Sequence, residues 1–326
     1  MKVVIFTGGT GGTKLVQGVQ RLVAPEALTV VVNTGDDIEW WGLHVSPDID
    51  SVLYGLSGLL SIDRGWGVDD DSFRCLERMK HLGEPAWFSL GDLDLATHLT
   101  RTSLLREGRT LTEATAELAK RMGINARVLP MSDERVATML ETSKGRLHFQ
   151  EYFVRERHSV EVSRVEFVGV ERSQPAPGLL EAIASADAIV FAPSNPVTSI
   201  GPILAVPGIR ETLRNAGAPV AAVSPIIGDA AVSGPAAALM RMQGWPSTIA
   251  GIAQAYADFL DVLVIDSADA HAADELSSED LRVVCSNTLM RSMDDKVNLA
   301  RVVLDSSLLC QHQSQDPSLA KEARSG

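Results

Sequence analysis

The acidic residues around position 50 are the first candidates for chemistry. Asp48 and Asp50 flank Ile49, and Asp36 and Asp37 stand a short way before them. Grouped carboxylates suit a hard divalent cation, and Mg²⁺ binds through one or two carboxylates together with substrate phosphates. Acids in a first helical turn are also common without any ligand, because they interact favourably with the helix dipole. The dipole explains Asp48 alone, whereas the pair favours a metal site.

Glycines near the N-terminus, at Gly8, Gly9, Gly11 and Gly12, are the second candidate. They follow an apolar run at residues 3–6, typical of a buried parallel strand, and precede an amphipathic stretch over residues 15–22. A strand, a glycine turn and a helix in this order bring backbone N–H groups close to an anion. The spacing GGxGG is neither the dinucleotide pattern GxGxxG nor a Walker A loop. A tight turn without a ligand has the same pattern, but an anion site is the better interpretation.

A third polar segment covers residues 89–98. Asp94 and His98 are four residues apart, and Thr97 lies three residues after Asp94. A helix would place these side chains on one face. A capped helix with a surface histidine explains the same pattern, and the metal spacing HExxH is absent.

Polar loops also follow several predicted strands. Asn33 to Asp37 follow a strand at residues 27–32, and residues 193–202 follow a strand at 188–192. Residues 224–228 follow a strand at 219–223. Ligands of open parallel sheets bind at the carboxyl edge of the strands, so these loops and the glycine turn predict a common crevice. Hydroxyls and backbone donors there suit phosphate, ribose or base recognition.

Alternating strands and helices predict an α/β fold, with a Rossmann-like, mostly parallel sheet and helices on both faces. We expect this core to comprise residues 1–62 and 123–310. Residues 63–122 predict a largely helical insertion that covers the crevice, with helices at 72–82, 92–106 and 110–121. An antiparallel pair is expected at 137–142 and 146–153, and a further strand at 160–170. Ser46 is expected to cap a helix that starts at Pro47. The polar segment 311–326 predicts a disordered tail.

The composition of the 326-residue chain excludes some functions. A formal net charge of −13 argues against a nucleic-acid partner. The three cysteines show no CxxC spacing, which favours a reduced, cytoplasmic setting. No signal sequence and no apolar run of membrane-spanning length is recognised. We expect a cytoplasmic protein that does not associate with a membrane.

Seven sequence blocks occur in a fixed order and carry a family resemblance. They are residues 6–12 (FTGGTGG), 32–37 (VNTGDD), 46–50 (SPDID), 90–98 (LGDLDLATH), 129–133 (LPMSD), 193–196 (PSNP) and 223–228 (VSPIIG). Together they closely resemble the 2-phospho-L-lactate transferases of coenzyme F420 biosynthesis, from Met1 to about Asp305. The resemblance implies an Mg²⁺-dependent phosphotransferase, typically a homodimer. Its acceptor would be the deazaflavin Fo (7,8-didemethyl-8-hydroxy-5-deazariboflavin), and its donor a guanosine diphosphate ester of lactate, enolpyruvate or glycerate.

The resemblance also implies roles for individual residues. Asp48 and Asp50 would hold Mg²⁺, and Asp50 would be the catalytic residue near the attacking hydroxyl. The residues expected to bind Fo are Asp50, Ser89, Asp92, Thr97 and His98. Those expected to bind the phosphates and the nucleotide are Gly8, Gly9, Thr10, Gly11, Gly12, Asn33, Asn195, Ser199 and Gly201.

Two departures from the family pattern bear on the donor. Leu93 replaces a frequent basic residue, and Ser89 replaces a longer polar or basic one. Both changes remove possible phosphate contacts, so we hypothesise a donor other than the lactyl compound. Two other functions stay open. A nucleotide-sugar-binding regulator of the same superfamily would share GGxGG, but we do not expect it to share the LGD…ATH and PSNP blocks together. A nicotinamide oxidoreductase is disfavoured by the absence of GxGxxG.

Overall fold

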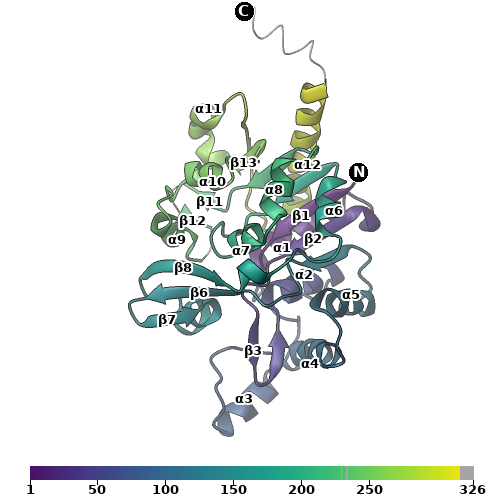
Figure 1. The fold of residues 1–326 in the computed structure, drawn as a ribbon, viewed down its shortest axis with the longest axis vertical. Coiled ribbons are helices and arrows are strands. Elements are labelled where there is room, and N and C mark those ends of the chain that lie inside the picture. The colour runs from purple at the N-terminus through teal and green to yellow at the C-terminus, as the bar shows by residue number, and fades with distance from the viewer. Residues whose placement is uncertain (229, 233, 316–326) are drawn as a thin grey trace, which may run out of the picture.

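The computed structural model describes residues 1–228, 230–232 and 234–315, and its centre is a seven-stranded sheet (Figure 1). The strands are β1 (Val3–Thr7), β2 (Leu28–Val32), β5 (Arg127–Pro130), β9 (Ala188–Phe191), β10 (Val220–Val223), β13 (Val262–Asp266) and β14 (Arg282–Ser286). Their order is β14-β13-β10-β9-β1-β2-β5, and every neighbouring pair is parallel. The α/β prediction is confirmed, and the sheet is wholly rather than mostly parallel.

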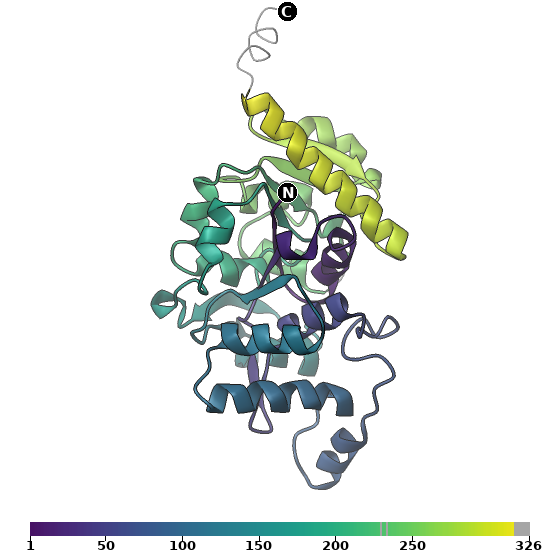
Figure 2. The same ribbon diagram turned by 90° about the vertical axis from the view of Figure 1, so that its right-hand side faces the viewer.

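Helices cover both faces of this sheet, because successive side chains of a strand point to opposite faces. Val3 and Ile5 of β1 belong to one apolar core, and Val4 and Phe6 belong to the other. The first core includes side chains of α1 (Thr10–Val19), α2 (Pro47–Ser57), α5 (Leu111–Arg121) and α12 (Met293–Gln315). The second includes side chains of α6 (Leu179–Ala184), α7 (Ile200–Ala205), α8 (Ile209–Arg214), α9 (Ala236–Met242) and α10 (Ile249–Ala255). In Figure 2, α12 lies along α1.

The segment between α2 and β5 is helical, as predicted. It contains α3 (Arg74–His81), α4 (Asp92–Arg106) and α5. Leu118 of α5 is buried in the first of the two apolar cores, whereas α4 packs against a hairpin of β3 (Ile38–Trp40) and β4 (Leu43–Val45). Figure 1 shows α3, α4 and this hairpin together at one end of the molecule. The hairpin was not predicted, because its strands have only three residues each.

A small antiparallel sheet consists of β6 (Ala137–Thr142), β7 (Gly145–His148) and β8 (Val162–Val168). The predicted strand over residues 146–153 is wrong beyond His148, because Glu151–Arg155 form a π-helix. Phe149 and Tyr152 are both buried, and their spacing of three residues requires a helical turn rather than a pleated strand. This small sheet is linked to the turn after β2 of the central sheet by a hydrogen bond from Thr138 N to Gly35 O, 2.7 Å long.

The C-terminal part adds a two-stranded ribbon, β11 (Ile226–Ile227) with β12 (Ala230–Ala231), and a short helix, α11 (Ala273–Leu276). Helix α12 runs to Gln315, so the predicted disorder of 311–326 is wrong for residues 311–315. Extending a helix that is already packed costs little, since its nucleation is complete. Residues 316–326 lie outside those described. Within the described ranges, no helix combines the length and apolarity needed to cross a bilayer.

Candidate active site

The glycine turn lies where the order of the sheet reverses. The chain places β2 and β5 on one side of β1 and then returns to place β9, β10, β13 and β14 on the other. Such a switch point leaves a crevice at the carboxyl ends of the two central strands. Across it, Gly8 N donates a hydrogen bond to Ser194 Oγ at 3.1 Å. A Cβ at Gly8 would lie 2.5 Å from Ser199 Cβ, so this approach requires glycine.

The start of α1 opens into the same crevice. Gly9 is the N-cap residue, and no side chain accepts a hydrogen bond from the first turn. Asp48 lies directly opposite, because a Cβ at Gly9 would be 2.5 Å from Asp48 Oδ1. Open N–H groups at a helix N-terminus attract an anion, and a carboxylate beside them can share a cation with that anion.

Asn33 joins three of the four predicted loops. Its Nδ2 donates to Asp48 Oδ2 at 2.9 Å and to Thr198 O at 3.4 Å. The turn after β1, the turn after β2 and the loop after β9 therefore meet around Asn33 and Asp48. In the fourth loop, residues 224–228, Gly228 N donates to both Asp269 carboxylate oxygens at 2.9 and 3.0 Å.

Three buried carboxyl groups at this edge have pKa values above the usual value for aspartate. Burial, with a contribution from the charge of Asp48, raises the pKa of Asp36 well above its usual value. Burial also raises the pKa of Asp37, against the opposing effect of His44 and Ser46. The pKa of Asp48 is raised to about 7 by burial, although the Asn33 hydrogen bond acts in the opposite direction. This part of the site would gain from a cation, which offsets crowded negative charge.

Asp50 faces a different set of groups, on α4. Arg101 Nη1 donates to Asp50 Oδ2 at 3.1 Å, and Nη2 donates to Oδ1. His98 lies between two acids, with Nδ1 at 3.5 Å from Asp50 Oδ2 and Nε2 at 3.2 Å from Asp94 Oδ1. Tyr54 OH completes the chain of contacts by donating to Asp94 Oδ1 at 2.6 Å.

The close pairing of these side chains shifts the pKa values of Asp94, Tyr54 and Arg101. Burial alone would raise the pKa of Asp94, but His98, Tyr54 and Arg101 together lower it. Burial and the charges of Asp50 and Asp94 raise the pKa of Tyr54 well above its usual value. Burial would lower the pKa of Arg101, yet the Asp50 carboxylate raises it. Arg101 is therefore charged at every physiological pH.

Known proteins resemble this chain over almost its whole length. The family model described as 2-phospho-L-lactate transferase CofD matches residues 3–303. The chain belongs to this family. A protein of Methanococcoides burtonii, named 2-phospho-L-lactate transferase, is 44% identical over 301 residues, covering 92% of this chain and 98% of its own. A protein of Streptomyces griseus, named phosphoenolpyruvate transferase, is 45% identical over 312 residues, covering 94% and 98%.

Solved structures share the fold at much lower identity. A crystal structure of a UPF0052 family member from Bacillus halodurans superposes with a TM-score of 0.63 at 18% identity, covering 93% of this chain and 98% of its own. This likeness supports the arrangement of sheet and helices described above.

The residues that the family resemblance singles out are only partly together. Asp50, Thr97 and His98 are all buried near Arg101. Asp92 points to α3 instead, where its carboxylate accepts from Ser72 Oγ and from the backbone N–H groups of residues 74 and 75. Contact between Asp92 and Fo therefore stays a prediction. The same is true of Fo contacts by the half-buried Ser89 and by the other residues expected to bind Fo.

Residues on the nucleotide side fall into two groups. Gly8, Gly9, Asn33 and Ser199 adjoin one another in the crevice. Gly12 is packed against β1, since a Cβ there would lie 1.9 Å from Thr7 Oγ1, while Thr10 is exposed. Gly11 approaches Pro193 O, and Gly201 lies against Phe167. Asn195 Oδ1 accepts from Val197 N at 2.9 Å, so this oxygen shapes its own loop.

The predicted Mg²⁺ site is compatible with Asp48 more readily than with Asp50. Among the residues that the structure describes, no group of three metal-ligating side chains is preformed. Mg²⁺ needs no such cage when substrate phosphates supply further ligands. Asp48 Oδ1 faces the glycine turn, whereas both oxygens of Asp50 contact Arg101. The donor set thus fits a metal held between Asp48 and a bound diphosphate.

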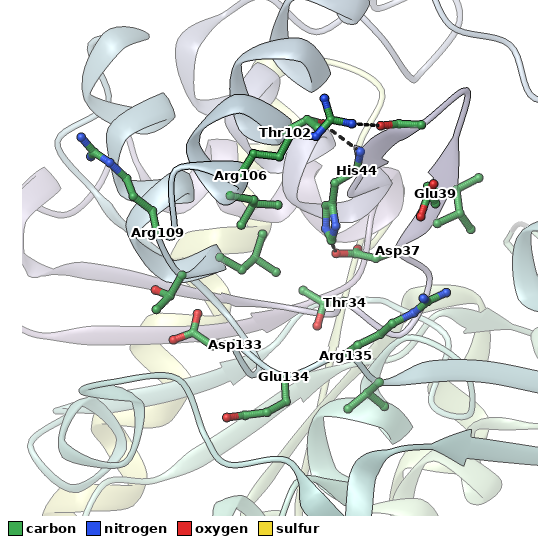
Figure 3. A pocket seen from close by; sticks show the side chains of 16 residues that line it. Thr34, Asp37, Glu39, His44, Thr102, Arg106, Arg109, Asp133, Glu134 and Arg135 are labelled. Atoms are coloured by element: carbon green, nitrogen blue, oxygen red, sulfur yellow. Dashed lines mark hydrogen bonds and ion pairs between the residues drawn. The ribbon is translucent and has the colours of Figure 1, made fainter.

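A cavity of about 460 Å³ lies beyond the turn after β2, beside the crevice. Figure 3 shows Asp37 and His44 pointing toward each other at its base, with Arg106 reaching across to the hairpin. Its lining also includes Thr34, residues 133–136 and the start of α5. None of the residues expected to bind substrate lines this cavity.

Arg101 and Tyr54 are the polar residues of the site that the sequence analysis did not single out. A signal for Arg101 was present, because Asp94, His98 and Arg101 share one face of α4 at spacings of four and three. Ser46 is the N-cap residue of α2, as predicted. Its Oγ makes no cap hydrogen bond to the helix and instead donates to Asp37 Oδ2 at 2.6 Å.

Proposed function

We propose that this chain transfers the phospho-acid moiety of a guanosine diphosphate ester to the terminal ribityl hydroxyl of Fo, forming F420-0 or its close analogue. The observation that carries the proposal is the meeting of Gly8, Asn33 and Asp48 at the switch point of the sheet. Membership of the family supplies the reaction class. The relatives named for lactyl and enolpyruvyl transfer are similar to nearly the same degree.

The reaction needs positioning and charge neutralisation rather than a covalent nucleophile. The hydroxyl oxygen of Fo bonds to the acid-bearing phosphorus as the bond from that phosphorus to the bridging oxygen breaks. GMP leaves with the bridging oxygen, and the hydroxyl proton is released. Backbone N–H groups at the start of α1 would hold the diphosphate, and Asp50 would accept a hydrogen bond from the hydroxyl. Mg²⁺, held by Asp48, would neutralise phosphate charge.

The donor is proposed to carry an acid other than lactate. Leu93 lies on the exposed face of α4, and Ser89 is half-buried just before it. Neither side chain offers the charge that a basic residue would present to a phosphate or carboxylate. This supports enolpyruvate or glycerate as the transferred acid.

Mass spectrometry of the product tests both parts. The purified chain is incubated with Fo, Mg²⁺ and the lactyl, enolpyruvyl or glyceryl donor in turn, and the product's mass identifies the acid. Transfer from at least one donor is expected, with Asp50→Ala folded but inactive. A clear lactyl preference would contradict the donor assignment, and no product from any donor would contradict the function.

The proposal also includes a cytoplasmic homodimer that requires Mg²⁺. Light scattering on the purified chain checks the dimer, and turnover after treatment with a chelator checks the metal. A monomer at working concentration, or full turnover without divalent cation, would contradict the corresponding part.

A further inference from the structure

Arg101 is the charged residue most deeply enclosed in the site. Its side chain is 0% exposed, and both terminal nitrogens contact the Asp50 carboxylate. A planar guanidinium matches the two oxygens of a carboxylate and so fixes its orientation as well as its position. Arg101 Nη1 also lies 3.3 Å from His98 Nδ1, which places the imidazole against the same carboxylate.

Asp48 and Asp50 point in different directions, although they are only two residues apart. Side chains at i and i+2 of a helix do not share a face. Asp48 accepts from Asn33 and adjoins Gly9, whereas Asp50 faces Arg101 on α4. The two acids therefore serve two different sides of the site, with Asp48 beside the phosphate-binding turn.

We propose that Arg101 is the positioning residue for Asp50 in the transfer reaction. It holds both Asp50 oxygens so that the carboxylate presents a fixed acceptor to the attacking hydroxyl. This inference rests on the proposed function. Arg101 itself need not touch substrate, because it acts through the orientation of Asp50.

A purely structural ion pair between α2 and α4 is the competing explanation. Lysine at position 101 would keep the charge and most of the stem, but one ammonium cannot match both carboxylate oxygens. A structural role would thus be largely rescued by lysine. A positioning role would not, because Asp50 could then rotate toward the phosphate-binding turn.

The test measures steady-state transfer by four variants: Arg101→Lys, Arg101→Met, Asp50→Asn and the double variant Asp50→Asn/Arg101→Met. For Arg101→Lys we expect kcat to fall by about tenfold to a hundredfold, as for a misplaced reacting group, with KM for the donor little changed. The double variant should be no slower than Asp50→Asn alone, because residues that act as one unit are not additive. Arg121→Met, which removes an exposed guanidinium of α5, is the control and should match the wild type.

Folding is checked separately, because Arg101→Met leaves a buried carboxylate unpaired. The double variant removes both charges and should melt close to the wild-type temperature. Wild-type kcat in folded Arg101→Lys, or multiplicative losses in the double variant, would overturn the inference. A wild-type chain without transfer activity would overturn the proposed function instead. In that case a crystal structure of Arg101→Lys still tests the positioning role. If the Asp50 carboxylate keeps its wild-type orientation in that variant, Arg101 does not position it.

Discussion

Gly9 and Asp48 face each other at the start of α1, and a single methyl group tests this contact. A Cβ in Gly9→Ala would lie 2.5 Å from Asp48 Oδ1, and Asn33 holds the same carboxylate in place through Oδ2. Either the carboxylate or the glycine turn must move, so we expect kcat/KM for the donor to fall by about tenfold to a hundredfold. Kinetics with the donor varied provide the measurement. Gly217→Ala is the matched control, because a Cβ there meets nothing within 4 Å.

Asp48 also makes stability depend on pH. Its pKa is raised to about 7, mainly by burial, whereas the unfolded chain releases this proton near pH 4. Between these values the folded state holds the proton and the unfolded state does not, so the contribution of Asp48 to the free energy of unfolding falls as pH rises. It levels off above about pH 7.

Asp48→Asn removes this dependence while keeping the acceptor for Asn33. Without ligands, we expect the variant to equal the wild type near pH 4 and to be more stable at pH 8. The difference should be a few kcal/mol at most, at about 1.4 kcal/mol per pKa unit. Urea unfolding at several pH values measures it. A constant difference across the range would show that the carboxyl titrates normally in the folded chain.

At the scale of elements, α5 has the clearest local start signal. Thr110 Oγ1 accepts from Glu113 N at 3.2 Å, and Glu113 Oε2 accepts from Thr110 N at 2.9 Å. This capping box satisfies two N–H groups that the first turn would otherwise leave open. Thr110→Ala should therefore lower the free energy of unfolding by about 1 kcal/mol, whereas Thr110→Ser should keep most of it. Denaturant unfolding compares the two variants, and equal losses would exclude the hydroxyl as the cause.

Elements with a strong local pattern were predictable. The central strands are continuous apolar runs because both their faces are covered, and α4 and α5 have clear start signals. The hairpin β3–β4 was missed, since its two short strands are stabilised by packing of Trp40 on Trp87 and Phe88. Such contacts between distant segments leave no periodicity in the sequence. The same reason applies to the π-helix at Glu151–Arg155, where burial of Tyr152 overrides the strand pattern.

At the scale of the whole molecule, the parallel sheet made the meeting of three loops predictable, because parallel strands bring their carboxyl ends to one edge. The partners of individual side chains were not predictable. Asp50 and Arg101 are 51 residues apart in the sequence, and only the tertiary structure brings them together. The direction of Asp92 toward α3 depends likewise on tertiary structure.

Ligand binding should stabilise the molecule as one unit. The crevice is lined by residues of the turn after β1 and of the loop after β9. Both apolar cores lie beneath these two segments. GDP with Mg²⁺ at about a hundredfold excess over its Kd should add about 2.7 kcal/mol to the free energy of unfolding. Calorimetry should show a single transition moving to higher temperature, with a smaller shift for ADP. Because Asp48 is the expected metal ligand, Asp48→Asn should lose the part of the shift that depends on Mg²⁺ and keep the rest. A full Mg²⁺-dependent shift in that variant would place the metal away from Asp48.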